Sequence, residues 1–339
     1  MNQKFLLIAG PCSAESREQV LETAKGLAAS GIGIFRAGVW KPRSKPGLFE
    51  GVGEEALKWL TEVKRQFHLP IATEVSSSEH VHMALAAEVD YLWIGARTTT
   101  NPFLVQEIAD AIVLHPNKPK GILVKNPISP DVNLWVGAIE RLQSCGAGEV
   151  MAVHRGFQTG QPTDYRNAPC WSISFALKKQ LPAIRLLLDP SHLAGNRNLI
   201  PPLIEQGVAL GYDGFMIESH IHPEQALSDA DQQLTPDELH AILGAIQTRD
   251  SSASDLLLPL RQQIDEIDDG IFALINKRME VSRKIGQIKK SESLLVFQEG
   301  RFAEIMNKRL KWAKENGLSA EMVETIMNAI HEESCKLQM

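Results

Sequence analysis

The residues best suited to metal chemistry gather between Ile184 and Leu234. Among its histidines and acidic residues, this stretch carries His192, Glu218 and Asp229. One imidazole nitrogen and two carboxylate oxygens suit a borderline divalent metal. His192 and Glu218 each follow a short apolar run, and in repeating strand–helix barrels the strand ends carry the active site. Taken alone, the pattern fits surface charge and turn chemistry equally well, so the rest of the chain has to decide.

Eight short apolar runs alternate with helix-like segments over the first ~250 residues. Parallel strands that are covered on both faces appear as continuous apolar runs, and eight strand–helix units in about 250 residues match a TIM barrel. A doubly wound open sheet is the alternative, and the lack of a Gly-x-Gly-x-x-Gly turn after the first run argues against it. The expected strands span residues 5–10, 32–38, 71–75, 91–95, 121–126, 149–154, 184–189 and 214–219.

A charged or metal-binding side chain follows every expected strand, so we expect all of them at one rim of the barrel. Arginine and lysine suit phosphate and carboxylate oxygens. Six cations at one mouth, in a chain of net charge -6, imply a substrate with several negative charges. The cations are Arg36, Lys41, Arg43, Arg97, Lys125 and Arg155, and the remaining strand-end residues are Cys12, Glu74, His154, His192 and Glu218.

A thiolate, an imidazole and two carboxylates form the candidate metal site. This donor set favours Mn, Fe, Zn or Co over Mg or Ca. A buried thiol at a turn is the simpler interpretation of Cys12 alone. His220 and His222 are rival ligands, and their alternation along a strand end should turn one of them away. The four candidate ligands are Cys12, His192, Glu218 and Asp229.

The composition gives no reason to expect nucleic acid or a membrane as partner. The chain has 339 residues, 44% of them hydrophobic and 22% charged, which is typical of a globular protein of about two domains. No apolar run approaches the ~18 residues of a membrane helix, and the N-terminal segment is interpreted as a first strand rather than a signal peptide. Four widely spaced cysteines favour a reducing, cytoplasmic compartment.

The pattern changes after residue 248. Residues 249–255 are small and polar and are interpreted as a linker. Apolar residues then recur at three- and four-residue spacing from Leu257 to Leu274, as in a coiled-coil seam. A helix ~50 Å long beside two shorter ones forms a poor core, so we expect it to pair with a second copy. The expected helices span residues 256–290, 299–315 and 319–337.

Seven ordered motifs in residues 1–248 carry a family resemblance. They are AGPCS, FRAGVWKPRS, IGAR, VKN, HRG, DPSH and the ESH…LSDADQQL segment. Together they resemble the 3-deoxy-D-arabino-heptulosonate 7-phosphate (DAHP) synthases, in the short type I form that is close to the octulosonate-phosphate synthases. The resemblance implies a TIM barrel that joins phosphoenolpyruvate to erythrose 4-phosphate and releases phosphate. Because the chain begins at the first strand, no additional N-terminal regulatory segment is expected.

The resemblance also implies a role for each residue at the mouth. Lys41 would lie between the two substrates and give a proton to the aldehyde oxygen, and Arg43 and Ser44 would bind the phosphate of erythrose 4-phosphate. The KPRS sequence favours erythrose 4-phosphate, whereas VKNPISP resembles the octulosonate enzymes, which use arabinose 5-phosphate, so that alternative stays open. The four candidate ligands would hold the metal. Phosphoenolpyruvate would be bound by Arg97, Lys125 and Arg155, with Arg36 near its carboxylate.

Charged side chains on the long helix have a spacing that fits a second small-molecule site. Arg278 and Lys289 are 11 residues apart and share a helix face, with backbones ~16 Å apart. Arg261 lies on another face, so an antiparallel second copy would have to bring it to the same ligand. Near the chain end, Ser334 and Gln338 are spaced i and i+4.

Residues 256–339 resemble the all-helical chorismate mutases, which are interlocked dimers that convert chorismate to prephenate later in the same shikimate pathway. Two positions depart from that family: Gln298 and Phe302 stand where it often has acids near the substrate hydroxyl. The helical domain could therefore be only a dimerising module that senses prephenate or chorismate, and we hypothesise that such a ligand controls the barrel. By resemblance, the carboxylates and nearby oxygens of chorismate would be bound by Arg261 of the partner copy, Arg278 and Arg301. Its ether oxygen would be bound by Lys289 and Gln338, and Ser334 would line the site.

Overall fold

The computed structural model describes residues 5–41, 47–160, 163–246, 254–296 and 299–338, with the backbone alone for residues 246, 254–262 and 299. The chain divides into two compact units, residues 1–249 and 250–339. Each unit is described by itself.

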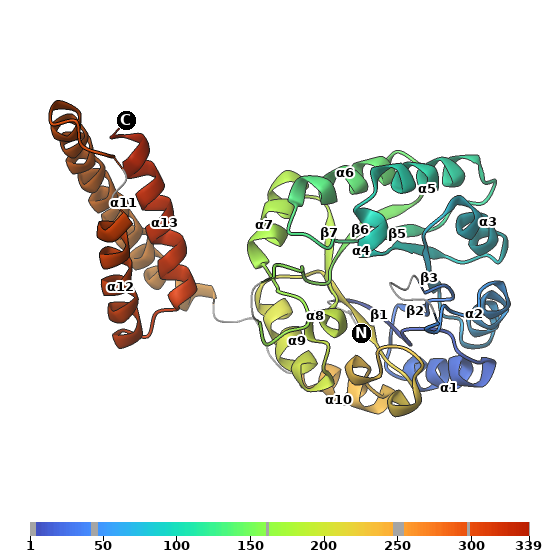
Figure 1. Cartoon of the computed structure of the whole chain (residues 1–339). Coiled ribbons are helices and arrows are strands. Elements are labelled where there is room, and N and C mark those ends of the chain that lie inside the picture. Colours follow the sequence, from blue (N-terminus) through green and yellow to red (C-terminus); the bar gives the residue numbers. More distant parts are fainter. Residues whose placement is uncertain (1–4, 42–46, 161–162, 247–253, 297–298, 339) are drawn as a thin grey trace. The chain divides into compact units, whose positions relative to one another are not determined.

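The first unit is a closed barrel of eight parallel strands in chain order, surrounded by helices (Figure 1). The barrel closes where β1 pairs with β8, from Leu6 opposite Gly214 to Gly10 opposite Glu218. This arrangement confirms the predicted TIM barrel and excludes the open sheet. The strands are β1 (Leu6–Gly10), β2 (Ile34–Arg36), β3 (Ile71–Val75), β4 (Tyr91–Ile94), β5 (Gly121–Lys125), β6 (Glu149–His154), β7 (Arg185–Leu188) and β8 (Gly214–Glu218).

The outer helices begin at residues that favour helix starts. Ser16 and Asn101 cap the first turns of α1 and α5 through their side chains, and Pro102 occupies the first position of α5. The helices are α1 (Arg17–Ala28), α2 (Glu54–Phe67), α3 (Ser78–Ala86), α4 (Ala96–Thr99), α5 (Pro102–Leu114), α6 (Val132–Gln143), α7 (Trp171–Gln180), α8 (Pro190–Ala194), α9 (Ile200–Ala209) and α10 (Pro236–Ile246).

Two hydrophobic cores result from the alternation of side chains along the strands. One fills the barrel interior and the other lies between the strands and the helices. Trp93 of β4 belongs to the interior core, and the guanidinium of Arg36 lies 4.5 Å from the centre of its ring. Its indole nitrogen donates to Glu74 at 3.1 Å. Trp93 therefore forms the floor beneath the charged groups at the carboxyl ends of the strands.

His154 does not lie at the rim, so that part of the rim prediction is wrong. On β6, Met151 and Val153 face the barrel interior, and His154 follows the opposite alternation toward α7. Its Nδ1 lies 2.6 Å from the Tyr212 hydroxyl and 2.9 Å from the Ser174 hydroxyl. The register of β6 therefore turns His154 into the outer core.

Burial lowers the pKa of His154 to about 3, so we expect the barrel to lose stability in mild acid. The unfolded chain, with a histidine pKa near ~6.5, binds the extra proton. This contribution to stability is complete above about pH 6.5 and is lost as the pH falls toward 3. Between pH 7.5 and 5.0 the loss should be about 2 kcal/mol in the free energy of unfolding.

Denaturant unfolding, followed by tryptophan fluorescence, checks this expectation. The His154→Gln variant should lose less stability than the native chain over the same pH range. His222→Gln, at an exposed histidine, is the matched control and should behave like the native chain. Equal pH dependence in His154→Gln and the native chain would contradict the assignment.

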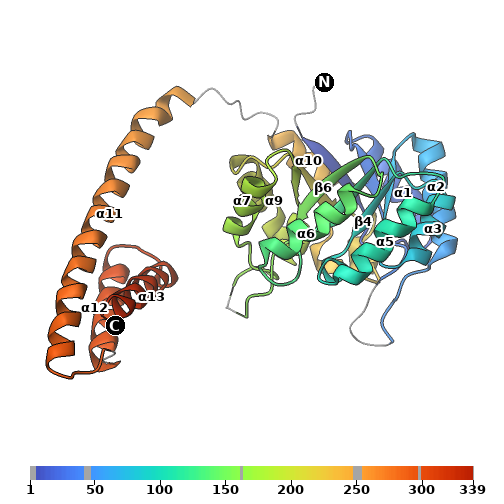
Figure 2. The same cartoon turned by 90° about the horizontal axis from the view of Figure 1, so that it is seen from above.

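The second unit consists of a long helix, α11 (Ser254–Ser291), with α12 (Glu299–Glu315) and α13 (Ala320–Lys336) packed alongside (Figure 2). The three predicted helices are confirmed to within two residues at each end. At Gly286 of α11 an added Cβ would lie 2.7 Å from the Cα of Gln338, so only glycine allows this close approach. None of the described helices combines the length and apolarity that a membrane crossing requires.

The predicted coiled-coil stripe of α11 remains largely uncovered within one chain. Ile267 and Leu274 are 61% and 66% exposed, and Ile264 and Ile271 are also exposed. Few side chains of this unit are fully buried among the described residues. The apolar stripe therefore lacks the cover that a stable helix of this length needs.

Candidate functional site

A cavity of about 360 Å³ opens at the carboxyl ends of the barrel strands. It gathers charged and polar side chains from loops that are far apart in the sequence. Its polar lining consists of Lys41, Glu74, Arg97, Lys125, Arg155, Gln158, Arg166, Asn167, His192 and Asp229.

Three of the four candidate metal ligands converge beside this cavity. The ligand atoms of Cys12, Glu218 and Asp229 all lie within 4.8 Å of one another. Cys12 follows β1, Glu218 ends β8, and Asp229 lies in the loop before α10. The fourth, His192, has its Nε2 3.7 Å from Oε1 of Glu218. Residues 180 positions apart are thus brought to one end of the barrel.

Asp189 positions His192 through the short helix α8. Its side chain caps the helix by accepting from the backbone nitrogen of His192 at 3.0 Å. The same carboxylate lies 2.9 Å from Nδ1 of His192. This contact sets the ring orientation and directs Nε2 toward Glu218, as in carboxylate–histidine pairs at metal sites.

Without a bound cation, the Cys12 thiol stays protonated at neutral pH. Burial, and then the charge of Glu218, raise the pKa of this thiol to about 12. A divalent cation deprotonates a thiol that coordinates it. Oε1 of Glu218 is buried and, among the described residues, has no hydrogen-bond partner. Nη1 of Arg36 lies 3.2 Å from this oxygen without hydrogen-bonding to it. A buried carboxylate oxygen that accepts no hydrogen bond, beside a thiol and an imidazole, suits a transition-metal ion.

The rival histidines lie elsewhere. His220 is buried, with its Nε2 3.7 Å from the Glu15 carboxylate. His222 is exposed. Neither belongs to the group of converging ligand atoms in the described part of the chain.

Some of the predicted cations line the cavity, and one lies deeper in the barrel. Lys125 and Arg155 line the cavity, where Lys125 pairs with Asp189 at 2.9 Å and Arg155 donates to Asn167 at 2.9 Å. Arg97 lines it from α4. Arg36 lies deeper, 1% exposed, with Nη1 3.2 Å from Oε1 of Glu218. Arg43 and Ser44 lie outside the described residues.

Lys41 links the metal-ligand group to the cavity. Its Nζ donates to Sγ of Cys12 at 2.9 Å and to the carbonyl oxygen of Cys12 at 3.2 Å. Burial alone would lower the pKa of Lys41, but Cys12 and Glu218 reverse the effect and hold it above its usual value. The side chain is therefore an ammonium at neutral pH and can donate a proton.

Several residues of this site could not be recognised from the sequence. Arg166 and Asn167 lie in the loop between β6 and α7, far from the end of the strand, so the strand-end pattern could not mark them. Gln232 and Gln233 are uncharged, although Gln232 donates to Glu218 at 2.7 Å and Gln233 accepts from the Cys12 backbone at 2.9 Å. The LSDADQQL motif contributes to the family resemblance, but its glutamines carry no charge that would point to these contacts.

In the helical unit, the structure brings together some of the predicted residues. Nη1 of Arg278 contacts the Ser334 hydroxyl and lies 3.4 Å from the Ile330 carbonyl oxygen. Lys289, on the same helix, donates to the Val296 carbonyl oxygen at 2.7 Å. Gln338 lies in the turn after α13 rather than in the helix, and its buried Oε1 has no hydrogen-bond partner among the described residues.

The other residues predicted for the mutase site make fewer contacts or lie outside the described residues. Arg301 is exposed and pairs with Glu304 at 2.7 Å. Phe302, one of the two departures from the family pattern, stacks on His331 with ring centres 4.0 Å apart. The side chain of Arg261 and the whole of Gln298 lie outside the described part of the chain.

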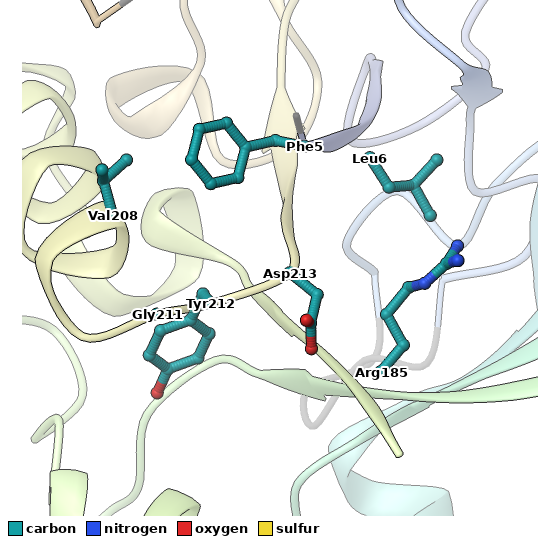
Figure 3. Close-up of a pocket in the computed structure, with 7 residues that line it drawn as sticks. All are labelled: Phe5, Leu6, Arg185, Val208, Gly211, Tyr212 and Asp213. Carbon is teal, nitrogen blue, oxygen red and sulfur yellow. The ribbon is translucent and has the colours of Figure 1, made fainter. Parts of the chain in front are cut away.

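A second cavity, of about 640 Å³, lies at the opposite end of the barrel (Figure 3). Leu6 and Arg185, at the starts of β1 and β7, line it together with Asp213 just before β8. Its charges are already paired: Arg185 lies 3.3 Å from Glu149, and Asp213 lies 3.0 Å from Lys178. It is larger than the mouth cavity but offers no converging set of ligand atoms in the described residues, so the chemistry is assigned to the mouth.

A closed parallel barrel with cations and metal-ligand side chains at its carboxyl end defines an α/β-barrel enzyme. The chain belongs to the DAHP synthetase I family, whose model matches residues 1–254, and the chorismate mutase type II model matches residues 260–339. Both family resemblances are confirmed, and the chain is an enzyme that combines a synthase-type and a mutase-type part.

Relatives of the barrel carry two names. A phospho-2-dehydro-3-deoxyheptonate aldolase of Thermotoga maritima is 32% identical over 233 residues, 69% of this chain and 66% of that protein. A 2-dehydro-3-deoxyphosphooctonate aldolase of Dechloromonas aromatica is 29% identical over 270 residues, 74% of this chain and 93% of that protein. The match thus spans just under two thirds of the Thermotoga relative.

Solved structures agree with the barrel assignment. The crystal structure of the Thermotoga maritima phospho-2-dehydro-3-deoxyheptonate aldolase (DAHP synthase) has a TM-score of 0.64 at 29% identity, covering 75% of this chain and 70% of that one. A truncated form of 3-deoxy-D-arabino-heptulosonate 7-phosphate synthase from the same organism has a TM-score of 0.61 at 27% identity, covering 75% and 88%.

Proposed function

We propose that the barrel catalyses the metal-dependent condensation of phosphoenolpyruvate with erythrose 4-phosphate, in which water adds to the former enol carbon, yielding DAHP and phosphate. The observation that carries this proposal is the convergence, at one mouth, of the Cys12–Glu218–Asp229 group, Lys41 and the cations of the cavity. Guanidinium and ammonium groups bind phosphate and carboxylate oxygens, so the cavity suits two phosphorylated substrates.

The proposed roles follow from position. Arg97, Lys125 and Arg155 would bind phosphoenolpyruvate, with Arg36 below them near its carboxylate. Lys41 would give its proton to the aldehyde oxygen as the new carbon–carbon bond forms. These fixed charges hold the two substrates face to face and stabilise the developing alkoxide, which together can account for much of a rate enhancement.

The proposed metal ligands are Cys12, His192, Glu218 and Asp229, and the bound ion would be Mn, Fe, Zn or Co. Such an ion would supply a Lewis acid that polarises and orients the aldehyde. We propose that Arg43 and Ser44 bind the phosphate of erythrose 4-phosphate.

An octulosonate 8-phosphate synthase is the second candidate, because relatives with that type of name match 74% of the chain. Incubating the protein with phosphoenolpyruvate and either erythrose 4-phosphate or arabinose 5-phosphate separates the two. We expect a seven-carbon product from the first aldose at a much higher kcat/KM. A preference for arabinose 5-phosphate would reverse the assignment.

For the helical unit we propose rearrangement of chorismate to prephenate. The contact of Arg278 with Ser334, with Lys289 on the same helix, supports a site for a dicarboxylate. Arg301 and Arg261 of a partner copy would complete the grip, and Gln338 would bind the ether oxygen together with Lys289. Binding the folded conformer and stabilising charge on the breaking C–O bond are sufficient for this reaction.

We further propose a homodimer that forms through the helical unit. The exposed apolar stripe of α11, which includes Ile267 and Leu274, suits a second α11 in an interlocked arrangement. Proposed domain bounds are 1–248 for the synthase, 249–255 for the linker and 256–339 for the mutase. Because all four cysteines are free thiols, we place the protein in the cytoplasm.

The fusion of the two parts motivates a regulatory proposal. Prephenate or chorismate bound at the helices would control the barrel, giving feedback on the first reaction of aromatic amino-acid biosynthesis. Removing residues 250–339 is then expected to abolish inhibition of phosphate release by prephenate. Inhibition that persists in the shortened chain would reject the idea, and a helical unit that binds prephenate without consuming chorismate would be only a sensor.

A further inference from the structure

A hydrogen-bonded bridge joins the outer oxygens of the two carboxylates in the proposed metal site. Gln232 donates from Nε2 to Oε2 of Glu218 at 2.7 Å. Arg166 donates from Nη1 to Oε1 of Gln232 at 2.7 Å and to Oδ1 of Asp229 at 2.9 Å. One amide and one guanidinium therefore hold one oxygen of each carboxylate.

The other oxygen of each carboxylate faces the ligand group. Oδ2 of Asp229 lies 3.3 Å from Sγ of Cys12. Oε1 of Glu218 lies 3.7 Å from Nε2 of His192 and 3.2 Å from Nη1 of Arg36, an ion pair without a hydrogen bond among the described residues. The bridge thus divides each carboxylate into a held oxygen and an oxygen that is available to a cation.

Gln232 is held by burial, and Arg166, whose side chain is half exposed, is held through its backbone. Gln232 is 1% exposed and ends the short 3-10 helix η3 (Ala230–Gln232). The backbone nitrogen of Arg166 donates to the Ala194 carbonyl oxygen at 3.1 Å, at the end of the helix that carries His192. Beside it, a Cβ on Gly195, at φ 67°, would lie 2.5 Å from the Cβ of Arg166. The bridge is therefore anchored to the elements that present the ligands.

We propose that Gln232 and Arg166 are positioning residues of the metal site, which hold Glu218 and Asp229 so that each binds the ion through one oxygen. This inference rests on the proposed metal-dependent function. A free carboxylate can rotate or bind through both oxygens, and the bridge removes both options. Hydrogen-bonding partners of this kind change metal affinity by about 10- to 100-fold when they are removed.

Gln232→Met is the sharpest test, because methionine has nearly the same length and neutral charge but cannot make the two hydrogen bonds. Full-length protein would be stripped of metal and titrated with Co²⁺, following both the dissociation constant and the visible absorption of the cobalt–thiolate centre. We expect Gln232→Met to bind Co²⁺ about 10- to 100-fold more weakly, with a changed spectrum. Gln206→Met, at an exposed glutamine on α9, is the matched control and should bind as the native chain does.

Gln232→Asn provides a second variant, which keeps the amide but is too short to reach both partners, and it should also weaken binding. Arg166→Met should be made in the native chain and in the Gln232→Met variant. Because the two residues act as one bridge, its effect on the dissociation constant should differ more than about threefold between these two backgrounds. If both glutamine variants keep the native Co²⁺ affinity and spectrum, the positioning role is wrong, while the proposed metal site itself stands. A native chain that binds no Co²⁺ would overturn the proposed metal site as well.

Discussion

Replacing Lys41 with methionine is expected to lower kcat for phosphate release by about 10²- to 10⁴-fold, the range for loss of a general acid. The ammonium lies between Cys12 and the cavity, 2.9 Å from the sulfur. Methionine keeps the length of the side chain but has no proton to give to the aldehyde oxygen. The KM for phosphoenolpyruvate should change much less, because Arg97, Lys125 and Arg155 remain.

Steady-state phosphate release with both substrates at saturation measures the effect. Lys58→Met is the matched control, since Lys58 is an exposed residue of α2 that pairs with Glu55 of its own helix. It should retain native kcat. A Lys41→Met chain that keeps more than about a tenth of native kcat would show that another group delivers the proton.

The largest effect in the helical unit is expected from Arg278→Ala. Loss of this guanidinium, which contacts Ser334, should lower kcat/KM for chorismate by about 10²- to 10³-fold, comparable to the loss of a transition-state charge contact. Phosphate release by the barrel without effectors should stay at the native rate. Under the regulatory proposal, inhibition by prephenate should weaken in the same variant.

Chorismate consumption and phosphate release, measured on the same preparation, separate these outcomes. Arg283→Ala, at an exposed arginine on the same helix, should leave both activities unchanged. Native chorismate consumption by Arg278→Ala would remove this arginine from the site. A native chain with no chorismate consumption would instead favour the sensor interpretation.

Strand and helix positions could be predicted well because burial imposes a simple pattern. A parallel strand covered on both faces has to be apolar along its length, and the observed β3 and β6 coincide with the predicted residues 71–75 and 149–154. The same argument located the ends of strands, and hence Cys12, Glu218 and most of the cations. The long α11 followed from its apolar spacing.

The site features that could not be predicted from the sequence depend on strand register and on loop conformation. His154 and Arg155 are neighbours at one strand end, and only the alternation within the folded sheet sends His154 outward and Arg155 to the cavity. Arg166 and Gln232 reach the site through loop conformations that no periodicity encodes. Gln338 falls in a turn after α13 because the helix ends at Lys336.

The central claim is that one metal ion at Cys12, His192, Glu218 and Asp229 makes the barrel a synthase. Phosphate release from phosphoenolpyruvate and erythrose 4-phosphate, measured on metal-stripped protein to which each divalent ion is added in turn, tests it most directly. We expect no turnover from the stripped chain, and recovery that saturates at about one equivalent of Mn, Fe, Zn or Co per chain but fails in Cys12→Ala. Full activity of the stripped chain, or full recovery in Cys12→Ala, would contradict the account.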